Sequence, residues 1–392
     1  MLRIVSLAIR KFQDKKNEQK VFNTFQSWCA NIATLAAPSN PKQRKLLIIK
    51  LDDIGDYLVF RNGLHTIRTA PRWQGYHITL LGNAAWKAIH DFADNTYTDA
   101  TIWMNKGKFF EDEDYRRSLW TELRQEGFEV VICPSYTRPL LLDDVCALAC
   151  KAPLNIAHHN TFKYPSWNAA SDAGYQELYR TNSVTLEHNF NTLFTHWCCN
   201  LPAPATIKPI HIPIPEVTTS LEPPYIMCFI GASTKSRQWP TPHWIDLIQK
   251  LNKQYNLPIV LAGGPNDATL AANIINSAPC SSIVGTISLV DMIAFTAKSS
   301  LVITNNTMMT HLAIACGCKT AIITNGENYY RFTEYQDVGY TRTRTVYPPK
   351  FTQLLAKPHG FEITHHVAVT SDIATVSVES VFKAANSLLQ MP

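Results

Sequence analysis

Asp56 is the residue whose type and setting point most directly to chemistry. The apolar run at residues 46–51 predicts a buried parallel strand, and residues 57–69 carry apolar side chains at helical spacing. Asp56 lies between them, in the kind of loop where open α/β sheets bind ligands. A helix start favours a charged carboxylate, so Asp56 is available as a base, although it could simply cap the helix. Gly55 permits a sharp turn or the close approach of a substrate.

The chain around Asp56 alternates strands with helices, which predicts parallel βαβ units. Its 392 residues are too many for one ordinary core and suit two α/β domains of similar size. In the first half we predict strands at 46–51, 77–81, 100–103 and 129–133, and helices at 57–69, 84–92, 115–125, 140–150 and 183–199. A stretch with five prolines, residues 201–217, follows and is typical of an interdomain linker.

The second half repeats the alternation. We predict strands at 225–230, 258–262, 301–304 and 320–324, and helices at 242–255, 267–277, 288–298 and 308–316. A final helix at 376–390 is expected to cross back onto the N-terminal domain. The predicted domains are an N-terminal domain at 42–205, a linker at 206–219, a C-terminal domain at 220–335 and a tail at 336–392.

Four loops of the second half converge on one sheet edge and together suit a diphosphate. The loop at 231–240 offers backbone N–H groups, hydroxyls and cations, and the start of the helix at 308–316 offers unpaired N–H groups. A Gly-Gly pair permits close backbone approach. The candidate donor-side residues are Ser233, Thr234, Lys235, Arg237, Gly263, Gly264, Asn306, Thr307 and His311. Each signal is weak alone, and their recurrence at one edge favours a functional reading.

The composition excludes several other classes of protein. No apolar run reaches the roughly 20 residues that a membrane helix needs, and no signal peptide is evident, so we expect a cytoplasmic protein. Most of the ten cysteines lie in apolar segments and are interpreted as buried hydrophobes. The pairs Cys146/Cys150 and Cys316/Cys318 lack partners at zinc-site spacing, so we expect no metal. No G-x-G-x-x-G follows a strand, which disfavours an NAD-dependent dehydrogenase.

The formal charge of +5 is concentrated at the N-terminus. Residues 1–20 hold six basic and two acidic residues, so the rest of the chain is close to neutral. Residues 1–41 form a predicted basic amphipathic helical extension. Its first part, residues 1–20, could lie on an anionic inner-membrane surface or pack on the protein, whereas packing is favoured for residues 21–37. We expect no nucleic-acid partner.

Three stretches resemble glycosyltransferase family nine, the heptosyltransferases of lipopolysaccharide assembly. They read IIKLDDIGDYLVFRNGLHTIR, GASTKSRQWPTPHWIDLIQKL and TNNTMMTHLAIACG, and VGTISLVDMIAFTAKSSLVIT also follows the family pattern. The likeness covers roughly residues 45–335. It implies a GT-B fold, in which two Rossmann-like doubly wound domains face each other across a cleft. It also implies metal-independent, inverting transfer from a nucleotide-activated sugar, typically ADP-heptose, to a hydroxyl of a surface glycan, without a cofactor.

In this resemblance Asp56 matches the catalytic base of the family. It would take the proton of the acceptor hydroxyl as that oxygen attacks the anomeric carbon. Lys235, Arg237 and the segment 306–311 would meet the charge of the leaving diphosphate. Acceptor contacts would come from N-domain loops, for which the candidates are Asp52, Asp53 and Arg138.

The chain departs from the family pattern at three places. Asp52-Asp53 stand where hydroxyl residues are common, and Arg237 stands where the phosphate-loop lysine is usual. Asn306-Thr307-Met308 replace Asp-Ser-Gly in the donor motif. Two readings follow: an active inverting glycosyltransferase that builds a bacterial surface glycan such as lipopolysaccharide or O-antigen, or a catalytically silent homologue that binds a nucleotide sugar or a partner protein.

Overall fold

Two six-stranded sheets carry the fold of this protein, which is described from a computed structural model. The structure describes residues 2–38, 43–161, 164–181, 185–217, 221–366 and 370–391. Contacts between residues divide the chain into two units. Unit 1 comprises Met1–Asp53, Gly63–Asn182 and Phe190–Ala205, and unit 2 comprises Ile54–Asn62, Ser183–Asn189 and Thr206–Pro392. The short segment that carries Asp56 therefore groups with the second unit.

The sheet of unit 1 is parallel throughout, as the βαβ alternation predicts. Its order is β3 (Ala100–Met104), β2 (His77–Asn83), β1 (Lys45–Lys50), β4 (Val130–Cys133), β5 (Leu154–His158) and β6 (Glu177–Tyr179). The direction of winding reverses between β1 and β4. In such sheets ligands bind outside the carboxyl ends of the strands at this switch point.

The sheet of unit 2 repeats the same winding with a new set of strands. Its order is β12 (Thr343–Val346), β11 (Thr320–Ile323), β10 (Leu301–Asn305), β7 (Ile226–Phe229), β8 (Ile259–Ala262) and β9 (Ser281–Ser282). All pairs are again parallel. The switch point lies between β7 and β10. The chain leaves β7 into the predicted phosphate loop and leaves β10 into the predicted donor motif.

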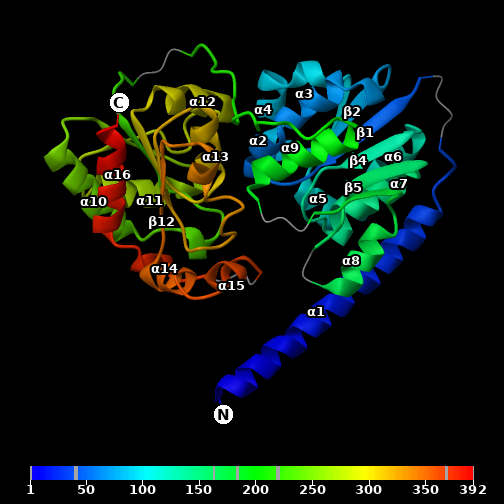
Figure 1. The fold of residues 1–392 in the computed structure, drawn as a ribbon, viewed down its shortest axis with the longest axis horizontal. Coiled ribbons are helices and arrows are strands. Elements are labelled where there is room, and N and C mark those ends of the chain that lie inside the picture. The colour runs from blue at the N-terminus through cyan, green and yellow to red at the C-terminus, as the bar shows by residue number, and fades with distance from the viewer. Residues whose placement is uncertain are drawn as a thin grey trace. The chain divides into compact units, whose positions relative to one another are not determined.

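Helices connect the strands of both sheets (Figure 1). In the first half they are α1 (Leu2–Ala33), α2 (Ile54–Phe60), α3 (Asn62–Thr69), α4 (Lys87–Ala93), α5 (Lys106–Glu111), α6 (Glu113–Gln125), α7 (Val145–Cys150), α8 (Pro165–Asp172) and α9 (Glu187–Cys198). In the second half they are α10 (Thr241–Gln254), α11 (Ala268–Ile275), α12 (Leu289–Lys298), α13 (Met308–Ala315), α14 (Pro349–Leu355), α15 (Gly360–His366) and α16 (Val378–Leu389).

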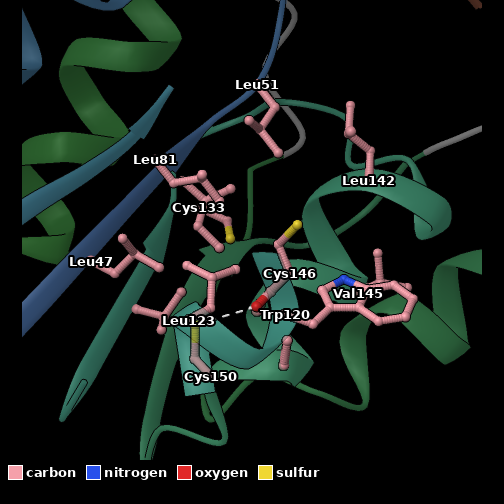
Figure 2. Packing of buried hydrophobic residues seen from close by; sticks show 14 of the residues in the cluster. Leu47, Leu51, Leu81, Trp120, Leu123, Cys133, Leu142, Val145, Cys146 and Cys150 are labelled. Atoms are coloured by element: carbon pink, nitrogen blue, oxygen red, sulfur yellow. Dashed lines mark hydrogen bonds between the residues drawn. The ribbon is translucent and has the colours of Figure 1, made fainter. Parts of the chain in front are cut away.

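Each unit has its own apolar core, formed by side chains from its strands and its helices. In unit 1 the side chains of Leu47 and Leu81 from the sheet meet Leu123 of α6 and the cysteines of α7 (Figure 2). Cys133, Cys146 and Cys150 are buried there, and the Cys150 Sγ donates to the Cys146 carbonyl at 3.3 Å. All ten cysteines are free thiols. The prediction that most of them act as buried hydrophobes is confirmed, because seven are buried.

The C-terminal half of α1 packs on unit 1. Phe25, Trp28 and Ile32 are buried in the core of that unit, which confirms the packing predicted for residues 21–37. Ser166 of α8 donates to Glu18 at 2.6 Å, and toward its N-terminus α1 runs on past α8 (Figure 1). The side chains of residues 2–15, which hold most of the basic residues assigned to a membrane surface, lie outside the described part of the structure.

The final helix, α16, differs from its expected placement. We expected it to cross back onto the N-terminal domain, but its buried face, Val381, Ala385 and Leu388, belongs to the core of unit 2. Lys250 of α10 and Glu379 of α16 form an ion pair at 2.8 Å beside this face. The spacing of apolar residues predicts that such a helix is amphipathic but does not identify the surface that it covers.

Candidate functional site

Asp56 lies in the first turn of α2, directly after the loop that leaves β1. Its side chain is half-buried, and its position places the carboxylate at the positive end of the helix, as predicted. The helix α2 packs against α13 of the donor motif within unit 2. The candidate base and the candidate donor-binding residues therefore lie in one unit.

Gly55 makes the contact between α2 and α13 possible. A β-carbon at Gly55 would lie 2.8 Å from Cδ2 of His311 and 3.3 Å from the α-carbon of Met308. Atoms this close would force the helices apart, so only glycine fits without a shift. The close approach that the sequence suggested at Gly55 is thus the approach of a helix of the protein itself.

His311 is a buried, neutral histidine beside the first turn of α2. Burial lowers its pKa to about 3, and its Nδ1 lies 2.6 Å from the hydroxyl of Tyr335. Tyr335 is also buried; burial first, and then nearby charges that include Asp56, raise its pKa. His311 and Tyr335 therefore form an uncharged hydrogen-bonded pair beside the first turn of α2. No motif or spacing in the sequence indicates Tyr335, which lies 24 residues after His311.

Asn305 anchors the phosphate loop to the end of β10. Its Nδ2 donates to the carbonyls of Ile230 and Gly231 at 3.0 and 3.1 Å, and its Oδ1 accepts from the Trp239 amide at 3.2 Å. Trp239 is fully buried and donates its indole N–H to the Val376 carbonyl at 3.0 Å. The two ends of the loop are thereby fixed, whereas Ser233, Thr234 and Lys235 between them are exposed.

The two predicted cations of this loop have different surroundings. Lys235 is exposed and lines an open pocket of about 500 Å³. The guanidinium of Arg237 instead binds Glu327 through two parallel hydrogen bonds, with Nε–Oε2 at 2.9 Å and Nη2–Oε1 at 2.8 Å. Glu327 lies just beyond β11 and had not been singled out in the sequence. The hydrogen bond from Arg237, together with its charge, lowers the pKa of Glu327.

The Gly-Gly turn after β8 is filled by a side chain of the protein. The carboxylate of Asp267 accepts a hydrogen bond from the Gly264 amide at 2.9 Å. A β-carbon at Gly263 would lie 2.8 Å from the same carboxylate oxygen, and Gly231 also faces it. We had assigned Gly263 and Gly264 to the donor, but the close approach that these glycines permit is that of Asp267.

Thr307 begins α13 in the way the sequence predicts. Its hydroxyl accepts from the Met309 amide at 3.3 Å, which caps the helix. The Asn306 amide donates to the Ile323 carbonyl at 2.8 Å and so joins this turn to the end of β11. The side chains of both residues are half-buried at the switch point of the unit 2 sheet.

At the switch point of unit 1, Asp52 forms an ion pair with a buried lysine, Lys50, which no sequence motif indicates. Lys50 is fully buried and lies 2.6 Å from Asp52 Oδ2, which also accepts from Ser135 at 2.9 Å. Burial by itself would raise the pKa of Asp52, but the Lys50 ammonium and these hydrogen bonds lower it. Asp52 is therefore an ionised carboxylate with 23% of its side chain exposed.

Asp143 lies beneath this pair and is buried. Ser135 donates to its Oδ1 at 3.3 Å. Burial, followed by the charges of Asp52 and Asp144, raises its pKa well above the ordinary value. Asp53, in contrast, is exposed and pairs with Lys106 at 2.7 Å. Of the two predicted acceptor-side aspartates, Asp52 is thus held rigidly and Asp53 lies at the surface.

Arg138, the third predicted acceptor-side residue, is fully buried. Its guanidinium pairs with Asp144 at 3.0 Å and Asp172 at 2.8 Å, and it also donates to the His158 carbonyl. Each of its three guanidinium nitrogens is engaged within unit 1. Arg138 therefore stabilises the fold of unit 1. From the sequence we expect it to contact a glycan, but its guanidinium is buried in a network of hydrogen bonds.

Across the residues that the structure describes, no group of three or more His, Cys, Asp or Glu side chains is arranged to hold a metal ion. None of the helices within those residues is long and apolar enough to cross a membrane.

The family model described as Glycosyltransferase family 9 (heptosyltransferase) matches residues 186–323. This match spans α9, the linker, the phosphate loop, the Gly-Gly turn and the donor motif up to β11. No curated protein matches the chain significantly.

Several solved structures share the fold at low sequence identity. A glycosyl transferase family 9 protein from Veillonella parvula has a TM-score of 0.67 at 16% identity, over 90% of this chain and 99% of that one. Escherichia coli ADP-heptose lps heptosyltransferase II has a TM-score of 0.60 at 14% identity, over 88% and 98%. Escherichia coli heptosyltransferase WaaC with ADP-2-deoxy-2-fluoro heptose has a TM-score of 0.64 at 12% identity, over 88% and 99%. The fold is therefore GT-B-like.

Proposed function

We propose a function from one premise: the chain belongs to glycosyltransferase family 9, through residues 186–323, and is a heptosyltransferase-like enzyme. It transfers a sugar, heptose or a related one, from a nucleotide diphosphate donor to a hydroxyl of a bacterial surface glycan such as lipopolysaccharide. The donor that we favour is ADP-heptose, because the solved structure of similar fold from Escherichia coli holds an ADP-heptose analogue.

The observation that carries this proposal is the packing of α2 on α13. It brings Gly55, the residue before Asp56, against His311, in the same unit as the phosphate loop and the capped start of α13. A carboxylate base, loop cations and a helix N-terminus are the groups that inverting transfer without a metal requires.

In the proposed reaction the acceptor hydroxyl attacks the anomeric carbon as Asp56 takes its proton. The bond from that carbon to the diphosphate oxygen breaks, and the nucleoside diphosphate leaves with the electron pair. Lys235 and Arg237 offset the charge of the leaving group, and the positive end of the α13 dipole adds to this effect. His311 is neutral at pH 7, so it does not form a competing ion pair with Asp56.

The test is release of free nucleoside diphosphate when the protein is mixed with a nucleotide sugar and acceptor glycan. We expect release to depend on the acceptor and the glycan to gain the mass of one sugar. Donor binding without any release, for ADP-, GDP-, UDP- and dTDP-sugars alike, would favour the catalytically silent homologue. The replacement of Asp-Ser-Gly by Asn306-Thr307-Met308 keeps that second reading worth testing.

We place the reaction in the cytoplasm, at the inner face of the inner membrane. The support is the net charge of residues 1–20, which anionic lipids attract. Deletion of residues 2–20 should lower co-sedimentation with anionic vesicles and leave binding to neutral vesicles unchanged. Equal co-sedimentation of the two proteins with anionic vesicles would indicate that the helix does not contact the membrane.

A further inference from the structure

We propose that Glu327 is a built-in competitor of the donor diphosphate for Arg237. Glu327 occupies the guanidinium of Arg237, and the diphosphate must displace it to bind there. The inference rests on the proposed function and deepens it, because it assigns a residue that sets donor affinity and product release.

The geometry of the pair is that of an arginine bound to a ligand anion. Nε and Nη2 of Arg237 donate to the two carboxylate oxygens of Glu327 at 2.9 and 2.8 Å. The planar guanidinium binds a carboxylate and a phosphate through the same pair of parallel hydrogen bonds. A carboxylate in this position therefore makes the contacts that a phosphate would make.

The pair is open to solvent, unlike the arginine network of unit 1. The side chains of Arg237 and Glu327 are 27% and 28% exposed, whereas that of Arg138 is 0% exposed. A ligand in solution can reach the first guanidinium and cannot reach the second. Because the pair is exposed, replacing the carboxylate by a phosphate has a small free-energy cost, since neither the guanidinium nor the carboxylate is left buried without a partner.

The loop does not depend on the Glu327 carboxylate for its shape. The backbone amide of Glu327 donates to Asn325 Oδ1 at 2.9 Å, and Asn325 Nδ2 donates to the Ser236 carbonyl at 3.2 Å. Asn325 thus joins the end of β11 to the phosphate loop through bonds that remain when the Glu327 side chain turns away. The carboxylate can leave Arg237 without unfolding the loop.

The balance of charge explains what the competition achieves. Within residues 231–240 the cations are Lys235 and Arg237, and Glu327 cancels one of them. The pKa of Glu327 is lowered by Arg237, so this cancellation persists at neutral pH. A diphosphate carries more negative charge than one carboxylate and can displace Glu327 from Arg237. Its affinity is lower than it would be without Glu327, because the ion pair must first be broken. Weaker binding favours release of the nucleoside diphosphate product.

Glu327→Gln tests the competition, because it removes the charge and keeps the volume. We expect the dissociation constants of ADP and inorganic pyrophosphate, measured by isothermal titration calorimetry, to fall about tenfold relative to wild type. In an Arg237→Ala background the same substitution should have no effect, since the contested cation is gone. Glu379→Gln, which removes the partner of Lys250 at 2.8 Å on α10, is the matched control and should not change binding.

The outcomes separate this inference from the proposed function. If the wild type binds neither pyrophosphate nor ADP, GDP, UDP or dTDP, the proposed function fails and the competition fails with it. If the wild type binds but Glu327→Gln binds equally well or more weakly, the competition alone is wrong and Glu327 holds Arg237 in place for the donor. Glu327→Ala serves as the second variant should the glutamine variant unfold at a lower temperature.

Discussion

The two sheets wind in the same order, yet the charged groups at their switch points are used differently. In unit 1 the cations Lys50 and Arg138 are buried, and each is paired with carboxylates of its own unit. In unit 2 Lys235 is exposed and Arg237 holds a carboxylate at the surface. A buried, satisfied ion pair fixes structure, whereas an exposed cation is available to a ligand. This difference supports our proposal that the donor binds at the switch point of unit 2.

The largest effect that would sharpen this comparison is expected from Arg138→Met. It leaves Asp144 buried without its cation, and loss of one partner of a buried pair costs about 3–5 kcal/mol. The free energy of unfolding of unit 1, measured in urea, should fall by that amount. Arg237→Met should change the unfolding free energy of unit 2 by less than about 1 kcal/mol, because the Arg237–Glu327 pair is partly exposed to solvent. Equal losses in the two variants would contradict the division of roles.

A second effect comes from one buried histidine in each unit, His311 in unit 2 and His158 in unit 1. Burial lowers the pKa of His311 to about 3 and that of His158 to about 4, from an ordinary value of 6.5. The unfolded chain therefore binds more protons than the folded one below pH 6.5, and stability falls as the pH is lowered through this window. Each pKa unit corresponds to about 1.4 kcal/mol, so the total loss is several kcal/mol.

The variant His311→Gln keeps an acceptor for Tyr335 and removes the titrating group. Its unfolding free energy in unit 2 should depend less steeply on pH between 6.5 and 3 than that of the wild type. His158→Gln is the counterpart in unit 1. An unchanged slope in the His311 variant would mean that the imidazole is protonated in the folded protein.

A third, smaller effect is expected from Gly55→Ala. The added methyl group meets His311 and the backbone of Met308, and overpacking of this kind costs about 1–3 kcal/mol. Because the shift moves α2, the turnover number should fall while the dissociation constant of the nucleotide changes little. Gly107→Ala, where the nearest neighbouring atom would lie 3.4 Å away, is the control. Normal turnover in the Gly55 variant would show that the contact does not position Asp56.

The smallest effect is expected from Lys235→Met, which removes one exposed ammonium. Donor affinity should fall about tenfold, as for the loss of one charge-assisted hydrogen bond, and stability should not change. Lys106→Met, which removes the partner of Asp53 in unit 1, should leave the affinity for ADP unchanged. If both variants bind ADP with equal affinity, the assignment of the donor to unit 2 loses its support.

Much of the fold could be predicted because its central strands are apolar runs bounded by turns. The four strands predicted in each half are present at or near their predicted bounds. The strands that escaped prediction are β5, β6, β9 and β12, which are short or carry polar residues. Ser281–Ser282 has no apolar residue, and Thr343–Val346 is half polar. These segments form strands because they pair with a neighbouring strand of the sheet, and their own sequence pattern does not predict it.

The site residues could be predicted where their roles depend on neighbouring residues in the sequence. They could not be predicted where their roles depend on contacts with residues far away in the sequence. Asp56 lies in the first turn of a helix and Thr307 caps one, and both positions follow from the residues before and after them. Arg138 was misread because its partner Asp172 lies 34 residues away. Glu327 was missed because it lies 90 residues from Arg237. From the sequence we assign Gly263 and Gly264 to the donor, but the Asp267 side chain folds back onto this turn. No spacing rule predicts that contact.

The central claim is that Asp56 is the base and shares a unit with the donor site, and Asp56→Asn tests it most directly. The substitution keeps the size of the side chain and removes its basicity. We expect transfer to fall by about 10²–10⁴-fold, with the dissociation constant of the nucleotide sugar unchanged. Asp91→Asn, at an exposed aspartate of α4 that pairs with Lys87, should transfer at close to the wild-type rate. Full transfer by Asp56→Asn would contradict the account.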